Sequence, residues 1–398
     1  MRFAYFCLPH IGGTYSVFKQ LRKGLAPHGI DVTWLGAGRT EAFSDPLWRS
    51  ELELGTSIDP AGVLSQNELA SALINALRSG GYDGVFVNVL ADRVQTNLMR
   101  YLPEDLLRVM IVHNITPGTY AAACSIRDNV HATVGVSERC AQDLITRFGF
   151  ASGQTVAIPN AVDVEAYEHI ERQPRERGKM RMVFLGRVED ASKGVFWLPK
   201  LLGRLPGNIT LTVAGDGPDL PKLKQEMQQH RSRVTFAGRV APEDVPELLA
   251  AHDLLIMPSR YEGFGITLVE AMAAGCVPVV SRIRGVTDTI VDHEKNGLLF
   301  TMGSMDEAAS QILGLSKNPK KLDEMAKAAQ IKAATGFSLE AMATRYAHII
   351  GKISQRRPAV APQLPLEQWS LPAGLRPGLR TYLPPRVKNW LRLVKERI

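Results

Sequence analysis

Carboxylates, glycines and two aromatic residues occur together in one stretch of the chain, PSRYEGFGITLVEAMAAGCVP, which runs from Pro258 to Pro278. A short apolar run ends at Pro258, and a loop containing Gly263 and Gly265 leads into a short helical segment that ends at Gly275. Glycines let backbone amides approach a ligand closely, and the N-terminus of a helix favours a phosphate. The stretch therefore predicts a ligand site built on a loop and a helix start.

Two glutamates indicate what such a site would bind. Glu262 lies in the loop and Glu270 in the helical segment, eight positions further on. Two carboxylates around one anion site would repel a bare phosphate, whereas a carboxylate accepts two hydrogen bonds from a vicinal diol. We therefore predict recognition of ribose or hexose hydroxyls.

The Glu, seven residues, Glu pattern with Gly-Phe-Gly after the first Glu resembles the retaining glycosyltransferases of the GT-B fold, in the large sucrose synthase and mannosyltransferase-like family, glycosyl transferases group 1. Further segments follow the family's order and spacing: Pro159-Asn-Ala-Val-Asp163, Gly186-Arg187 with Lys193-Gly194, Ala214-Gly-Asp-Gly-Pro218 and Phe236-Ala-Gly238. The resemblance covers roughly residues 1 to 345 and is strongest from 155 to 300. Five segments in order make it specific.

The resemblance implies two catalytic cations. Arg187 and Lys193 would neutralise the donor diphosphate, whose leaving group gains negative charge as the glycosidic bond breaks. The chain has no Asp-x-Asp pair, the usual divalent-metal clamp of the other main glycosyltransferase architecture. We therefore expect no metal and no cofactor, with a nucleotide-diphosphate sugar of the UDP or GDP type as co-substrate.

The resemblance also implies contacts to the donor sugar and ribose. Glu270 would hold the ribose hydroxyls. Glu262 would contact the transferred sugar as a catalytic residue, helped by the backbone amides of Gly263, Phe264 and Gly265.

In the first half of the chain, Gly12-Gly13 would let the backbone approach the diphosphate. His113 matches the family's sugar-contacting histidine. The family retains anomeric configuration, apparently through front-face attack, and we assign no covalent nucleophile.

Each of these residues also has a plain structural interpretation. Glu262 and Glu270 would be solvated carboxylates, and Arg187 and Lys193 charges on an exposed loop. His113 would be a satisfied histidine at a strand end, and Gly12-Gly13 a tight turn.

The elements that would position these residues alternate between short apolar runs and amphipathic stretches, as strands and helices of a parallel sheet do. In the first half, we predict helices at Tyr15–Ala26 and Asn67–Arg78 and strands at Arg2–Leu8, Asp31–Leu35, Gly84–Val89, Arg108–His113, Ala132–Val136 and Thr155–Ile158. In the second half, we predict strands at Met180–Leu185, Ile209–Ala214, Val234–Ala237, Leu254–Pro258 and Val277–Ser281.

This pattern predicts an α/β protein of the GT-B class, with two doubly wound Rossmann-like domains facing a cleft. Residues 1–170 would form an acceptor-side domain, 171–180 a linker and 181–350 the donor-binding domain. Residues 351–398 would form a Pro-rich, basic tail with an amphipathic helix.

The positive charge is concentrated in that tail. The chain has 398 residues and a formal net charge of +7, yet from Lys352 onward ten Lys and Arg face only two Glu. The remaining residues carry 37 basic and 38 acidic side chains, so the body lacks the basic face that nucleic-acid binding needs. The four cysteines show no CxxC pair, which favours a reduced, intracellular setting.

Two interpretations of the tail remain open. It would either cross back and pack on the first domain, or present Arg386–Ile398 as a basic amphipathic helix to an anionic membrane surface. The second would place a cytoplasmic protein peripherally on the inner face of the plasma membrane.

The sequence thus predicts a retaining hexosyltransferase that acts on a saccharide or lipid-linked saccharide in bacterial polysaccharide or glycolipid synthesis. Two alternatives are a non-catalytic glycosyltransferase-like binding protein and a nucleotide-sugar epimerase. The absence of G-x-G-x-x-G after the first strand counts against dinucleotide binding.

Overall fold

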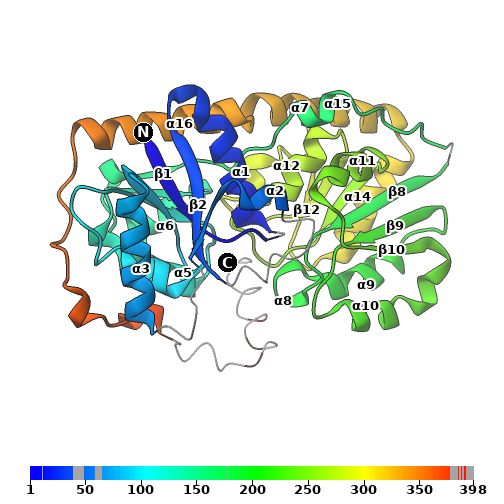
Figure 1. Ribbon diagram of the computed structural model, residues 1–398. Coiled ribbons are helices and arrows are strands. Elements are labelled where there is room, and N and C mark those ends of the chain that lie inside the picture. The colour runs from blue at the N-terminus through cyan, green and yellow to red at the C-terminus, as the bar shows by residue number, and fades with distance from the viewer. Residues whose placement is uncertain are drawn as a thin grey trace. The chain divides into compact units, whose positions relative to one another are not determined.

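The computed structural model describes residues 1–10, 12–38, 49–58, 65–176 and 178–376, together with Pro384, Val387 and Trp390. The chain forms two compact units (Figure 1). Unit 1 contains Met1–Asn160 and the described residues from Leu339 to Arg376, and unit 2 contains Ala161–Ser338.

Unit 1 is built on a parallel sheet in the order β3-β2-β1-β4-β5-β6-β7. Chain order reverses beside β1, as in a doubly wound sheet. Strands β1, β4 and β5 are near-continuous apolar runs because helices cover both faces of such a sheet. Their bounds are β1 Arg2–Phe6, β2 Asp31–Ala37, β3 Gly55–Ile58, β4 Gly84–Asn88, β5 Leu107–Val112, β6 Ala132–Gly135 and β7 Thr155–Ala157.

The helices of unit 1 follow from apolar faces and end caps. In α1 (Gly13–Leu25), Val17, Phe18 and Leu21 are fully buried. A capping box starts α3 (Gln66–Ser79), where Ser65 and Glu68 exchange side-chain to backbone hydrogen bonds of 3.3 and 2.7 Å. The remaining helices are α2 Arg49–Leu52, α4 Arg93–Leu98, α5 Pro117–Cys124, α6 Glu138–Phe148 and α16 Leu339–Gln355.

Unit 2 repeats the plan with a parallel sheet in the order β10-β9-β8-β11-β12-β13. Its strands are β8 Met180–Leu185, β9 Ile209–Ala214, β10 Val234–Gly238, β11 Leu254–Met257, β12 Val277–Ser281 and β13 Leu298–Phe300. Its helices are α7 Glu165–Glu168, α8 Asp190–Lys193, α9 Leu198–Leu202, α10 Leu220–Glu226, α11 Val245–Ala250, α12 Ile266–Ala273, α13 Thr287–Ile290, α14 Met305–Ser316 and α15 Pro319–Gly336. The two doubly wound α/β units confirm the predicted fold class.

The compact units differ from the predicted bounds at both ends of the second domain. We expected residues 1–170 in the first domain and a linker at 171–180, but unit 2 begins at Ala161 and includes α7. We expected the second domain to run to residue 350, but α16 belongs to unit 1 and packs beside α1 (Figure 1). The contact is close, since a Cβ on Gly24 of α1 would lie 3.0 Å from the Cβ of Ala343. On the inner side of α16, the Tyr346 ring lies 5.9 Å from that of Phe86 in β4. These apolar contacts explain why the helix joins the first sheet.

Residues 358–376, which we call the strap, also pack on unit 1. The Tyr101 hydroxyl donates to the Gln368 carbonyl at 3.1 Å and accepts from the Ser370 amide at 3.0 Å. The Trp369 ring stacks on Tyr101 with centroids 4.6 Å apart. Leu375 near the end of the strap is 1% exposed. This part of the tail therefore follows the packing interpretation.

The predicted amphipathic helix Arg386–Ile398 lies outside the described residues, except for Val387 and Trp390. Both are helical, and they are 41% and 61% exposed. In the part of the chain that the structure describes, no helix has the length and apolar character that crossing a bilayer requires.

Candidate functional site

The predicted ligand loop connects β11 to α12 in unit 2. Gly265 directly precedes α12 with φ of 97°, a left-handed conformation that glycine adopts without strain. The backbone amides of Gly263, Phe264 and Gly265 donate no hydrogen bond within the described part of the chain. The Phe264 ring is buried, 5.7 Å from that of Phe337, so only its backbone faces a ligand. The loop thus presents three successive donors at a helix start.

Glu262 lies in this loop with only 8% of its surface exposed. Its Oε1 accepts hydrogen bonds from Ser259 Oγ at 2.7 Å and from Lys193 Nζ at 2.6 Å. Ser259 is fully buried, so its hydroxyl is held in place. Oε2 has no partner among the described residues, which leaves one carboxylate oxygen to accept from a ligand hydroxyl.

Lys193 reaches Glu262 across 69 positions of sequence. It is the last residue of α8, and Gly194 ends that helix with φ of 62°. The ammonium has three N–H donors and uses one of them in the hydrogen bond to Glu262, so two remain for an anion. The structure therefore brings together two of the predicted site residues, one cation and one carboxylate.

Arg187 follows β8 on an exposed loop. Its side chain forms no ion pair or hydrogen bond within the described residues, so its five donors are available to a phosphate. The backbone beneath it is tightly packed, since a Cβ on Gly215 would lie 1.9 Å from the Gly186 carbonyl oxygen. These glycines let the turns after β8 and β9 touch, which holds Arg187 at the carboxyl end of the sheet.

Glu270 lies in α12 and is half-buried. Its carboxylate forms no ion pair or hydrogen bond with the described parts of the chain. Burial raises the pKa of its carboxyl to about 7, because no cation compensates for the lost hydration. Donated hydroxyls from a ribose would supply that compensation.

In unit 1, the structure places Gly12 and Gly13 at the start of α1. A Cβ on Gly12 would lie 2.9 Å from the His10 ring, so the backbone passes close to that side chain. His113 directly follows β5.

The His113 ring is held by Asn88, which sequence reasoning missed. His113 Nε2 lies 2.7 Å from Asn88 Oδ1, and Asn88 Nδ2 donates to the Phe6 carbonyl at 2.9 Å. Because Nδ2 must face that carbonyl, Oδ1 must accept, and Nε2 of His113 therefore carries the proton. Burial lowers the pKa of His113 to about 4, so the ring is neutral with Nδ1 as an acceptor. An amide at the end of an otherwise apolar strand is the signal that could have revealed Asn88.

The predicted residues thus divide between the two units. Arg187, Lys193, Glu262 and Glu270 lie in unit 2, whereas Gly12, Gly13 and His113 lie in unit 1. The cleft that would unite them stays a prediction.

Comparisons with known proteins bear on the family and on the fold. Residues 167–332, most of unit 2, match the family described as Glycosyl transferases group 1. The fold resembles that of HepE from Anabaena, solved with UDP and glucose, with a TM-score of 0.72 at 20% identity over 88% of this chain and 100% of that one. It also resembles sucrose-phosphate synthase from Thermosynechococcus elongatus, with a TM-score of 0.73 at 18% identity over 89% and 99% of the two chains. Unit 2 thus matches the group 1 glycosyltransferase family, and the chain has the GT-B fold.

Curated relatives of this chain include a glycogen synthase of Mycobacterium tuberculosis, 28% identical over 67% of this chain and 68% of the relative. The MMP alpha-(1->4)-mannosyltransferase of Mycolicibacterium hassiacum is 27% identical over 56% and 54% of the two chains, so the match spans about half of that relative.

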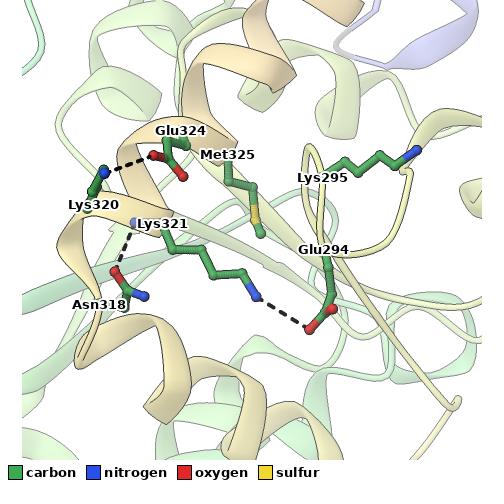
Figure 2. Close-up of a pocket in the computed structure, with 7 residues that line it drawn as sticks. All are labelled: Glu294, Lys295, Asn318, Lys320, Lys321, Glu324 and Met325. Atoms are coloured by element: carbon green, nitrogen blue, oxygen red, sulfur yellow. Dashed lines mark hydrogen bonds and ion pairs between the residues drawn. The ribbon is translucent and has the colours of Figure 1, made fainter.

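A hollow of about 400 Å³ elsewhere on unit 2 contains none of the site residues (Figure 2). Figure 2 shows the ion pairs Lys321–Glu294 and Lys320–Glu324, at 3.4 and 3.9 Å, among its lining residues. Two of the three lysines that line the hollow therefore already have carboxylate partners.

Proposed function

We propose that the chain is a retaining glycosyltransferase that transfers a hexose from a nucleotide-diphosphate sugar, of UDP or GDP type, without a metal ion. The observation that carries this proposal is the group around Glu262: a carboxylate with one oxygen held by Lys193 and Ser259 and the other open, beside three free backbone amides. Such a group suits a neutral, hydroxylated ring joined to a phosphate.

Arg187 and the two remaining protons of Lys193 would hold the diphosphate and stabilise the charge that develops on the leaving phosphate. Glu262 Oε2 would accept from a hydroxyl of the transferred sugar, and Glu270 would accept from the ribose hydroxyls. His113, neutral, would accept from a sugar hydroxyl at Nδ1. With no covalent nucleophile assigned, retention would come from front-face attack, in which the leaving phosphate takes the acceptor proton.

A thermal-shift screen against UDP, GDP, ADP and their sugar conjugates, without added metal, tests the donor site. We expect one nucleoside diphosphate to stabilise the protein, and we expect Arg187→Ala and Glu270→Ala to remove that shift. Arg204→Ala and Glu324→Ala serve as controls because these residues lie in exposed ion pairs with Asp306 and Lys320. A folded sample that no nucleotide stabilises contradicts the proposal, and turnover with the selected donor distinguishes an enzyme from a binding protein.

We further propose that the acceptor is a saccharide or lipid-linked saccharide, and that the basic tail brings the enzyme to an anionic membrane surface. Arg386–Ile398 carries five basic residues and one acidic residue, and each cation near such a surface contributes about 1 kcal/mol. Co-sedimentation with vesicles containing phosphatidylglycerol tests this. We expect deletion of Arg386–Ile398 to abolish binding, and unchanged binding would refute the membrane role.

A further inference from the structure

The pairing of Lys193 with Glu262 requires an element that holds two loops together. Lys193 ends the four-residue helix α8, and Glu262 lies in the irregular loop after β11. Neither segment is long enough to fix its own position, because a single helical turn is not stable by itself.

Arg260 joins these two segments. Its backbone amide donates to the Ser192 carbonyl at 2.7 Å, and its Nε donates to the Asp190 carbonyl at 2.8 Å. Nη2 lies 3.1 and 2.9 Å from the two carboxylate oxygens of Asp190. The guanidinium also lies 3.8 Å from the centre of a Trp197 ring, and the side chain is 8% exposed. Arg260 thus contacts the first and the third residue of α8, the helix that carries Lys193.

Asp190 is itself fixed from its other side. Its amide donates to Asp219 Oδ2 at 2.7 Å, and its Oδ1 accepts from the Phe196 amide at 3.1 Å. The backbones also meet, since a Cβ on Gly194 would lie 2.3 Å from the Pro258 carbonyl oxygen. Any shift of the Arg260–Asp190 pair would therefore move Lys193 relative to Glu262.

We propose that Arg260 is a positioning residue that sets the separation of the Lys193 ammonium from the Glu262 carboxylate. The proposal rests on the donor-site roles given above to those two residues. Arg260 would act through α8, because its side chain faces Asp190 and Trp197. Arginine is required because lysine, with one nitrogen, cannot donate to both the carbonyl and the carboxylate of Asp190 while lying over an aromatic ring.

Arg260→Lys is the first test, since it keeps the positive charge but cannot donate to Asp190 from two nitrogens. We expect kcat/KM to fall about 10-fold or more, a loss typical of a misplaced reacting group. In a Lys193→Ala background, we expect Arg260→Lys to have little further effect, because the residue it positions is absent. Asp190→Asn should follow the same pattern. Arg204→Lys, in an exposed pair with Asp306, is the matched control and should leave kcat/KM unchanged.

A second measurement needs no substrate. Lys193 in its ion pair should react slowly with an amine-acylating reagent, and Arg260→Lys should raise that rate several-fold, measured by mass spectrometry of the labelled peptide. Equal losses in the presence and absence of Lys193, or an unchanged labelling rate, would overturn the role of Arg260. Absence of nucleotide binding and turnover in the unmodified protein would instead contradict the proposed function, while the labelling result still decides the role of Arg260.

Discussion

Glu270 makes the affinity for the donor depend on pH. Its pKa is raised to about 7 by burial, and hydroxyl donors stabilise the ionised form. Binding therefore favours loss of a proton, and affinity should fall as the pH drops below about 7, by up to about tenfold per pH unit. Calorimetric titration with a nucleotide sugar at pH 5.5 to 8 measures this, since its diphosphate diester does not titrate there. Glu270→Gln should flatten the profile, and a sloped profile in that variant would assign the dependence to another group.

His113 should remain neutral from pH 5 to 8 with the proton on Nε2. This expectation follows from the Asn88 hydrogen bond of 2.7 Å and from burial, which lowers the pKa of His113 to about 4. Asn88→Leu removes the acceptor, so the proton is no longer held on Nε2 of His113. We expect this to raise the activation free energy by about 1 kcal/mol, which lowers kcat several-fold. Nitrogen-15 NMR of the imidazole reports the tautomer directly. A protonated ring at pH 6 in the unmodified protein would refute the assignment.

At the scale of elements, two buried tyrosines test how the strap and α16 are held. The Tyr101 hydroxyl makes two hydrogen bonds to the strap, whereas the Tyr346 hydroxyl on α16 is buried with no partner in the described part of the chain. Tyr101→Phe leaves a backbone donor and acceptor unpaired and should cost about 1–3 kcal/mol of unfolding free energy. Tyr346→Phe removes an unsatisfied hydroxyl and should be neutral or stabilising. Urea unfolding of both variants gives the comparison, and equal losses would contradict this account.

Long apolar segments were predictable from the sequence, and short or mixed ones were not. β8, β9 and β12 have the predicted bounds because each is a mainly apolar run of five or six residues inside a parallel sheet. β3 and β13 were missed, since Gly55–Ile58 has one apolar residue and Leu298–Phe300 spans three positions. Periodicity cannot identify segments this short.

The candidate site was predictable where glycines and carboxylates occur together, as in the β11–α12 loop. The residues that hold the site residues in place were not predictable. Asn88 and Arg260 act through contacts with residues distant in sequence, and the local spacing of residues does not predict such contacts. The sheet against which α16 packs was equally unpredictable, because the sequence of an amphipathic helix does not indicate which sheet the helix will cover.

For the whole molecule, buried histidines should make stability fall in acid. The backbone amide of the fully buried Arg108 donates to His131 Nδ1 at 3.0 Å, and burial is the main cause that lowers the pKa of His131 to about 4. Between about pH 6.5 and 4 the unfolded chain binds a proton that the folded chain does not. The contribution of His131 is therefore complete above about pH 6.5 and is lost at up to about 1.4 kcal/mol per pH unit as the pH falls.

His131→Asn tests this, because Asn keeps an acceptor for the Arg108 amide without a titrating ring. We expect a shallower fall in unfolding free energy between pH 6.5 and 4, measured by denaturant titration at several pH values. Glu270 acts in the opposite sense, since its raised pKa favours the folded state as the pH falls from about 7 to 4.5. Comparison of each variant with the unmodified protein isolates the histidine, and identical slopes would contradict its role.

The placement of α16 bears on how the protein is made. Ribosomes deliver the chain from its N-terminus, so the strands of unit 1 emerge well before the helix that covers α1, with all of Ala161–Ser338 in between. Limited proteolysis of released chains truncated after Ser338 should find unit 2 resistant and unit 1 cleavable, and a resistant unit 1 would show that it forms without α16. During synthesis, unit 2 would thus fold first. The apolar surface around Phe86 would stay exposed to chaperones until α16 is synthesised.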